Sequence, residues 1–482
     1  MNLIISLIVA ALPVDSNAVS QTTGPLTVYV NADGGDDRND CLSAGAACLT
    51  LQSAVNRLPK QIYNPVTVQL AAGSYAGAFI EGFTLHVPVD AGVDYSYLWV
   101  NGTLVPYVPD AGTSSGITTF ASPTVDSTFQ VLSDSTQTWV PGSLVGQFVD
   151  ITGGTGCCGT VSSPTTFPIV ANTATDLTVL GASITDAGST YQLVTTGTVF
   201  TSTVTLPTTS GSPAATDVPG PGDLAYFNNQ GTGFAASRLG FALGSANSRG
   251  VVTTDSRLNA FLLKMNSNSG AATGVFGPLQ TPMGPPSIRQ SVFQWPSGSG
   301  NIVLYGGSGG GPAMTGVNLY NSYFENGAIA VYSSSASGLL IAGCMFNGQS
   351  FASIFGQGSG INQIVGTRIT NAAFGIRNTE NYSVGLNFNA FGIQTTDISN
   401  SSVAAISLTD PYSSVYARTL TGTGNAIGLQ ISRGAKAQIG SAVTMTGTVE
   451  VSIDGTPSSW AAMRASVPPV ISNPSYFTAF YQ

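Results

Sequence analysis

Three acidic residues in the C-terminal half of the 482-residue sequence are the first candidates for chemistry: Glu380, Asp397 and Asp410. Hydrolysis of a glycosidic bond needs two carboxyl groups, about 5–5.5 Å apart when configuration is retained and about 6.5–9.5 Å apart when it is inverted. Asp397 with Glu380, or Asp397 with Asp410, gives the only acid pairs in this half whose separation approaches one turn of a repetitive β fold. The competing interpretation for all three is a solvated surface position.

Other chemistries find less support in the sequence. Proton abstraction beside a uronate carboxylate needs a Lys or Arg base and usually an Asp cluster that holds Ca²⁺, but basic residues are sparse and no paired Asp follows Asp40. The single His86 has no identifiable orienting acid for a triad. No cysteine spacing resembles a zinc site, and we expect no cofactor. We therefore expect catalysis to be absent or weak.

The acidic residues near the start have two interpretations. Asp33, Asp36, Asp37 and Asp40 lie close together in the sequence. A solvated turn is favoured over a cation site. Cys41 and Cys48 bracket a short turn in the same region, and they could form a disulfide in an oxidising compartment.

The composition predicts a β protein. Only 8% of residues are charged, and Gly numbers 58. Long charged side chains suit helical surfaces, whereas Ser, Thr, Asn and Gly suit strands, turns and polar ladders. The formal net charge of −9 excludes nucleic acid as a partner, because a phosphate backbone needs a basic surface.

Residues 27–80 contain three elements in order: an extended segment over 27–31, a helix over 51–58 and a strand over 66–70. Thr50 suits the helix N-cap, and Pro59 ends the helix. The apolar residues of this helix share one face: Leu51, Ala54, Val55 and Leu58.

The ordered trio TVYVNADGGDD, CLTLQSAVNRLP and VTVQLAAGSYAGAFI resembles the start of pectin-lyase-like β-helix proteins, bacteriophage tailspikes among them. The resemblance covers residues 27–90. It implies that the helix caps the first coil of a right-handed parallel β-helix and so covers an open sheet edge.

Residues 121–199 differ in texture and read as short strands separated by Gly-rich turns. The phrase VANTATDLTV at 170–179 is similar to one that recurs in a small β module inserted in many phage tail proteins. Trp139 in this segment invites a sugar-platform interpretation, but a position in a small β core is favoured.

Residues 200–455 are loosely repetitive. Asn recurs before apolar residues at intervals near one β-helix coil of roughly 20–25 residues, the signature of a solenoid; the positions are Asn326, Asn347, Asn371, Asn389 and Asn425. We expect these residues at left-handed turn corners, where Asn tolerates positive φ and its amide can form ladders. We expect Phe324, Phe346 and Ile369 to stack inside the solenoid.

The two ends of the chain differ from the repetitive part. Residues 1–26 read as an apolar anchor and linker, with a signal peptide as the alternative. The apolar run is too short to span a bilayer. Residues 456–482 are rich in Pro and aromatic residues, and we interpret them as a C-terminal cap or trimer clasp.

The predicted fold class is all-β: a right-handed parallel β-helix over 27–120 and 200–455, with an inserted small β domain over 121–199. The resemblance favours a structural component of a bacteriophage tail, a tail fibre or tailspike located in the virion. The expected partners are two further copies in a homotrimer, other tail proteins through the N-terminus, and a host-surface glycan or protein. The alternatives are a depolymerase that cleaves host polysaccharide, and a secreted or cell-surface adhesin or wall-associated protein.

Overall fold

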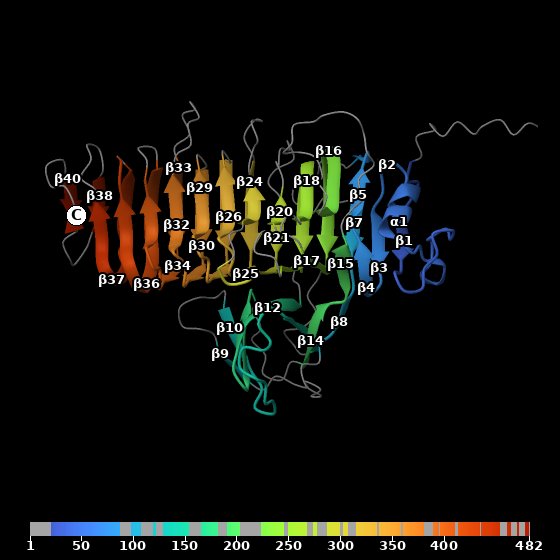
Figure 1. Ribbon diagram of the computed structural model, residues 1–482, viewed down its shortest axis with the longest axis horizontal. Coiled ribbons are helices and arrows are strands. Elements are labelled where there is room, and N and C mark those ends of the chain that lie inside the picture. Colours follow the sequence, from blue (N-terminus) through green and yellow to red (C-terminus); the bar gives the residue numbers. More distant parts are fainter. Residues whose placement is uncertain are drawn as a thin grey trace, which may run out of the picture.

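Parallel pairing between strands three places apart in the chain defines the architecture. In the computed structural model, β25 (Tyr323–Glu325) pairs with β28 (Met345–Asn347), and β28 pairs with β31 (Arg368–Thr370). Every coil therefore contributes one strand to each of three faces, and the coils stack into a rod (Figure 1). The chain is a right-handed parallel β-helix, as the sequence predicted.

The structure describes residues 21–86, 98–107, 119–121, 129–153, 165–181, 190–202, 223–244, 249–267, 273–276, 287–298, 302–306, 315–334, 337–357, 360–379, 389–394, 396–409, 413–433, 435–453, 460–463, 470–471 and 478–481. The predicted N-terminal anchor therefore lies almost wholly outside the described residues.

The first part of the rod precedes the antiparallel sheet in the chain. Its strands are β1 (Leu26–Val30), β3 (Val66–Leu70), β4 (Gly73–Ala76), β5 (Ala78–Glu81) and β7 (Leu98–Asn101). Beside them lie the 3-10 helix η1 (Ala44–Ala46), the helix α1 (Leu51–Arg57) and a two-stranded sheet of β2 (Gln61–Ile62) and β6 (Thr84–Leu85).

The second part of the rod follows the antiparallel sheet. Its strands up to β28 are β15 (Thr198–Ser202), β16 (Asp223–Ser237), β17 (Leu239–Leu243), β18 (Arg249–Phe261), β19 (Lys264–Ser267), β20 (Thr273–Phe276), β21 (Ser287–Arg289), β22 (Val292–Gln294), β23 (Ile302–Gly306), β24 (Thr315–Tyr320), β25, β26 (Ile329–Ser334), β27 (Ser337–Ala342) and β28. The later strands are β29 (Ala352–Gln357), β30 (Gly360–Val365), β31, β32 (Phe374–Thr379), β33 (Asn389–Gln394), β34 (Thr396–Ser399), β35 (Ala404–Leu408), β36 (Ser413–Ile431), β37 (Lys436–Ile453), β38 (Trp460–Met463), β39 (Val470–Ile471) and β40 (Thr478–Tyr481).

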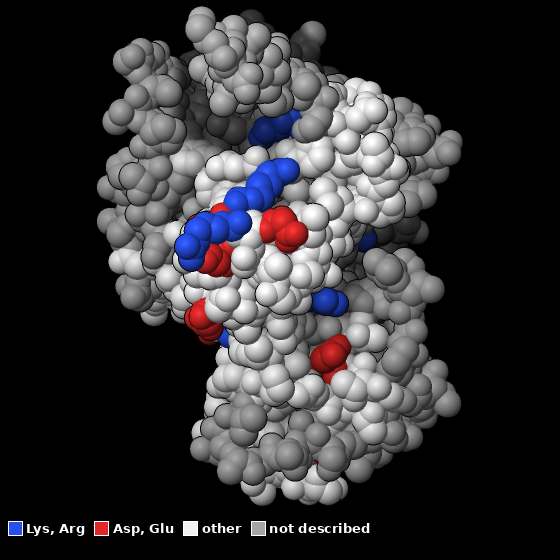
Figure 2. All heavy atoms as spheres, turned by 90° about the vertical axis from the view of Figure 1, so that its right-hand side faces the viewer, with Lys and Arg blue, Asp and Glu red and all other residues white. Residues whose placement is uncertain are grey.

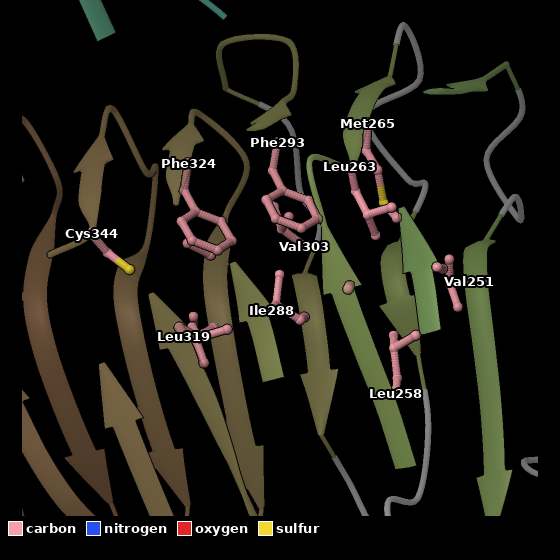
Figure 3. Close-up of a cluster of buried hydrophobic side chains, with 14 of the residues drawn as sticks. Val251, Leu258, Leu263, Met265, Ile288, Phe293, Val303, Leu319, Phe324 and Cys344 are labelled. Carbon is pink, nitrogen blue, oxygen red and sulfur yellow. The ribbon is translucent and has the colours of Figure 1, made fainter. Parts of the chain in front are cut away.

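Equivalent apolar side chains stack inside the rod. Phe324 pairs in register with Phe346, and Phe346 with Ile369, which confirms the predicted stack. The rings of Phe324 and Phe346 lie 4.8 Å apart at an angle of 12°. Phe293 continues the stack at 4.7 Å from Phe324 (Figure 3). All four side chains are buried, so each coil contributes to one continuous core.

The recurring Asn residues occupy two kinds of position. Asn326 and Asn371 have φ of 59° and 57°, as predicted for turn corners. The prediction is wrong for Asn347, Asn389 and Asn425, which lie in strands β28, β33 and β36.

Glycine explains two of these departures. Gly348 and Gly424 take the positive φ beside Asn347 and Asn425, since glycine has no Cβ to oppose that conformation. The amides bond between coils instead. Asn347 Oδ1 accepts from Asn371 Nδ2 at 2.8 Å, an example of the expected ladder, and Asn425 Nδ2 donates to the carbonyl of Ile398 at 2.8 Å.

Helix α1 covers one end of the rod (Figure 1). Thr50 is its N-cap, and Thr50 Oγ1 accepts a hydrogen bond from the backbone N–H of Ser53. The predicted apolar face, formed by Leu51, Ala54, Val55 and Leu58, is buried in the same core as β1 and β3. Cys41 and Cys48, which precede the helix, form a disulfide.

A seven-stranded antiparallel sheet projects from the side of the rod (Figure 1). Its strands are β8 (Leu104–Pro106), β9 (Thr119–Ala121), β10 (Phe129–Ser133), β11 (Phe148–Gly153), β12 (Thr166–Asn172), β13 (Asp176–Leu180) and β14 (Thr190–Thr196). The chain enters it after β7 and returns to the rod at β15. Trp139 is buried in the core of this sheet, as predicted. The inserted β segment thus begins at Leu104, before the start at residue 121 that the sequence suggested.

Parallel pairing continues beyond residue 455. Strand β38 pairs with β37 and β40, and β39 pairs with β37. The described parts of the C-terminal segment therefore extend the ladder of the rod. Their predicted role as a cap or trimer clasp stays a prediction.

Candidate functional site

Asp397 lies on the outer surface of the rod. It occupies β34 between the buried residues Thr396 and Ile398, so strand alternation turns its side chain away from the core. Ser399 Oγ donates a hydrogen bond of 2.5 Å to Asp397 Oδ1. The carboxylate is half-buried and has this hydroxyl as a fixed neighbour.

Among the described residues, no carboxylate is in register with Asp397 on either neighbouring coil. Its register partners are Arg368 on β31 and Thr421 on β36. Glu380 and Asp410 lie outside the described residues. The carboxylate pairs suggested by the sequence therefore stay predictions.

Arg368 lies where the antiparallel sheet packs on the rod. Its guanidinium lies 4.5 Å from the ring centre of Phe129, on β10. Phe129 belongs to an apolar cluster that joins both bodies and also contains Phe148, Val194, Val292 and Tyr323. Asp397 thus lies one coil away from Arg368, which packs against the antiparallel sheet.

Lys264 forms a polar contact across the same junction. Its Nζ donates to Gln147 Oε1 at 2.6 Å and to Thr195 Oγ1 at 3.2 Å. The side chain is only 7% exposed, and this burial lowers its pKa to about 8. Both bonds join groups of the two bodies, so the contact fixes the sheet against the rod.

A second face of the rod carries a different row of side chains. Its inward residues include Val331, Ile354 and Ile376, which are buried. The residue that follows each of these is in register with its equivalents on the neighbouring coils. We call this row the outer ladder; it consists of Tyr332, Phe355, Arg377, Ser407 and Gln430.

The outer ladder changes in chemical character along the rod. Tyr332, Phe355 and Arg377 are half-exposed. Tyr332 and Phe355 have ring centres 5.5 Å apart. Beyond Arg377, Ser407 is buried and Gln430 is half-buried. Ser407 Oγ donates to Gln430 Oε1 at 2.9 Å. At about 4.8 Å per coil, the five positions extend over roughly 19 Å.

Aromatic rings surround Arg377 on several sides. Its guanidinium carbon lies 4.7 Å from the ring centre of Phe374, 4.9 Å from that of Phe351 and 6.0 Å from that of Phe355. Phe351 meets both Phe355 and Phe374 edge to face. Burial among these rings lowers the pKa of Arg377. The ladder therefore combines a fixed cation with half-exposed aromatic surface.

Sequence reasoning did not identify the outer ladder. The signal was present, because Tyr332, Phe355 and Arg377 each follow an aliphatic residue by one position at intervals near one coil. The sequence predictions covered the recurring Asn residues and the inward stack, but not the outward residues between them. Only the register shows that they form one row.

The acidic cluster near the start serves the local structure. Asp37 Oδ1 accepts the backbone N–H groups of Leu49 and Thr50, at 3.0 and 2.9 Å. A side-chain hydrogen bond from Arg38 lowers the pKa of Asp36 to about 2. Figure 2, which faces the α1 end of the rod, shows acidic and basic side chains close together on this end. These contacts agree with the interpretation of the cluster as a solvated turn.

His86 lies beside the two-stranded sheet near α1. It stacks on the ring of Tyr63 at 4.1 Å and forms a hydrogen bond with Gln61. Within the described ranges, no three His, Cys, Asp or Glu side chains are grouped so that they could hold a metal ion. Nor does that part of the chain contain a helix long and apolar enough to cross a membrane.

Comparisons with known proteins give matches to solved structures only. No protein-family model and no curated protein matches the sequence. A GH136 lacto-N-biosidase from Eubacterium ramulus is similar over 95% of this chain, with 11% identity and a TM-score of 0.36. The chain spans 66% of the length of that protein.

Two bacteriophage proteins are also similar. One is the Gp54 tailspike of Acinetobacter baumannii bacteriophage AP22, solved in complex with A. baumannii capsular saccharide. The match covers 90% of this chain and 71% of the tailspike chain, with 9% identity and a TM-score of 0.23. The other is the Pseudomonas phage phi297 tailspike gp61. The match covers 89% of this chain and 74% of the tailspike chain, with 11% identity and a TM-score of 0.23.

Proposed function

We propose that this protein is a rod-shaped component of a bacteriophage tail that binds a glycan on the host surface. The observation that carries the glycan-binding part is the outer ladder. Sugar rings have apolar C–H faces that pack on aromatic side chains, while their hydroxyl groups need polar partners. The ladder offers Tyr332 and Phe355 for the first requirement, and the half-buried Gln430 for the second.

The geometry of the ladder suits an extended polymer. The five positions lie in one row along the rod, at the spacing of the coils. A polysaccharide chain laid along the axis would meet successive aromatic, cationic and polar groups. The ladder lies on strands rather than on loops, so its side chains are held by the core beneath them.

The placement in a phage tail rests on the sequence. Residues 27–90 resemble the start of tailspike β-helices, and the phrase at 170–179 is similar to one in phage tail modules. We place the protein in the virion tail, as a homotrimer joined to other tail proteins through its N-terminus.

Glycan binding is testable with purified protein. We would measure the affinity for a panel of bacterial capsular and O-antigen polysaccharides by biolayer interferometry, for the wild type and for the double variant Tyr332→Ala, Phe355→Ala. We expect the double variant to bind at least tenfold more weakly. The matched control is Tyr416→Ala, an aromatic residue 46% exposed on β36, where that strand pairs with β33 on another face. Equal affinity of the double variant and the wild type would refute the assignment to this ladder.

A second candidate function is cleavage of the bound polysaccharide. Asp397 is half-buried on the outer surface of β34 and would be one of the two carboxyl groups that glycoside hydrolysis needs, with Glu380 or Asp410 as the other. The variants Asp397→Asn, Glu380→Gln and Asp410→Asn separate the two pairs, because release of reducing ends is abolished when either member of the acting pair is removed.

A further inference from the structure

Arg377 is the only charged member of the outer ladder, and it lies beside aromatic side chains. Its guanidinium is held among Phe351, Phe355 and Phe374. Interaction with the faces of these rings stabilises the cation. It also fixes the plane of the guanidinium, so the terminal N–H donors are positioned in advance of any ligand.

The charge of Arg377 has no protein counter-ion in the described part of the chain. The one ion pair within 4.0 Å there joins Arg38 to Asp36, at the far end of the rod. The Nε atom of Arg377 is buried and has no hydrogen-bond partner. Ring contacts compensate the charge only in part, because they accept none of the in-plane N–H groups. None of the described residues therefore supplies an acceptor to this guanidinium.

Carboxylates provide the acceptor geometry that a guanidinium fits. Two parallel N–H···O bonds join the two planar groups, and such bonds are stronger than neutral ones. The chain has a formal net charge of −9, so its long-range field repels anions. An anionic ligand would thus be bound through local contacts at Arg377 rather than through a general basic surface.

We propose that the outer ladder selects acidic polysaccharides, with Arg377 binding a carboxylate on a sugar ring that lies beside Phe355. This inference rests on the proposed glycan-binding function and deepens it by naming the ligand class. Tyr332 and Phe355 contact the neighbouring sugar faces, and Gln430 contacts a hydroxyl group further along the polymer.

The test compares each acidic polymer with its own neutral derivative. The probes are polygalacturonate, alginate and hyaluronan, each alongside a carboxyl-reduced form in which the uronic acid has become a neutral sugar. Binding is measured for the wild type, Arg377→Met and Arg377→Lys. Met keeps a flexible apolar side chain against the rings, and Lys keeps the charge without the planar fork. Thermal unfolding checks that each variant is folded.

We expect the wild type to bind at least one acidic polymer and to bind its carboxyl-reduced form at least tenfold more weakly. Arg377→Met should lower the affinity for the acidic polymer to that of the reduced form, and Arg377→Lys should give an intermediate value. Equal affinity of the wild type for both forms, or binding to neutral polysaccharides only, would overturn the acidic selectivity and leave glycan binding in place. Failure to bind any polysaccharide, here and in the wider panel, would overturn both.

Discussion

Lys264 Nζ of the rod donates a hydrogen bond of 2.6 Å to Gln147 Oε1 of the antiparallel sheet. The lysine is 7% exposed, and its second partner is the hydroxyl of Thr195. No carboxylate is among these partners, so burial is the cause that lowers its pKa to about 8 from an ordinary value of 10.5. Folding therefore disfavours the charged form of Lys264 at the junction between the rod and the antiparallel sheet.

This relationship predicts how stability depends on pH. Between about pH 8 and 10.5 the unfolded chain keeps a proton on Lys264 that the folded protein releases. The contribution of Lys264 to the free energy of unfolding should therefore rise with pH in this window, by up to about 1.4 kcal/mol per pH unit. Below pH 8 the burial penalty is fully present, because both states are charged.

The measurement is urea denaturation between pH 7.5 and 9.5. Burial raises the pKa of Cys344 from 9.0 to about 12, and it also raises the pKa of Tyr191 and Tyr323. Each of these groups lowers stability as pH rises past its ordinary pKa. The test is therefore the difference between the wild type and Lys264→Met: the stability of the wild type should rise relative to that of the variant across this range. Parallel profiles for the variant and the wild type would contradict the assignment.

Replacement of Phe346 by Ala should destabilise the rod strongly. Phe346 is fully buried between Phe324 and Ile369 in the central stack. A cavity at such a site costs about 3–5 kcal/mol, which lowers the midpoint of denaturant unfolding. Tyr416→Ala, at an exposed position, should change stability by less than about 0.5 kcal/mol. Similar losses for both variants would mean that the stack is not a stabilising core.

Polysaccharide cleavage should be absent or weak. The register neighbours of Asp397 are Arg368 and Thr421, neither of which is an acid. The assay is release of reducing ends from host capsule or O-antigen, for which we expect no turnover or weak turnover. Turnover that Asp397→Asn abolishes, with folding intact, would instead identify the protein as a depolymerase with Asp397 in its active site.

The protein should be a homotrimer in solution. A rod with 8% charged residues exposes large neutral faces, and assembly around a three-fold axis buries one face of each copy. Multi-angle light scattering should give about three times the chain mass of 49.1 kDa. A monomer at micromolar concentration, with the N-terminal segment intact, would contradict this expectation.

Local sequence was enough to predict the elements whose conformation depends on near neighbours. Thr50 as N-cap and the apolar face of the helix it starts follow from residues within one or two turns. The stack of Phe324, Phe346 and Ile369 was also predictable, because a solenoid repeats its inward positions at a nearly constant interval.

Tertiary structure decided which residues of separate coils lie side by side. Coil lengths vary, so the interval between Arg377 and Ser407 cannot be read from a fixed period, although the two are in register. The same holds for Asp397, whose neighbours depend on the length of the intervening loops. Phe129 and Arg368 meet only because the antiparallel sheet folds back on the rod. Side-chain types thus determine the inward or outward face of a strand, whereas the register between coils determines the composition of a surface site.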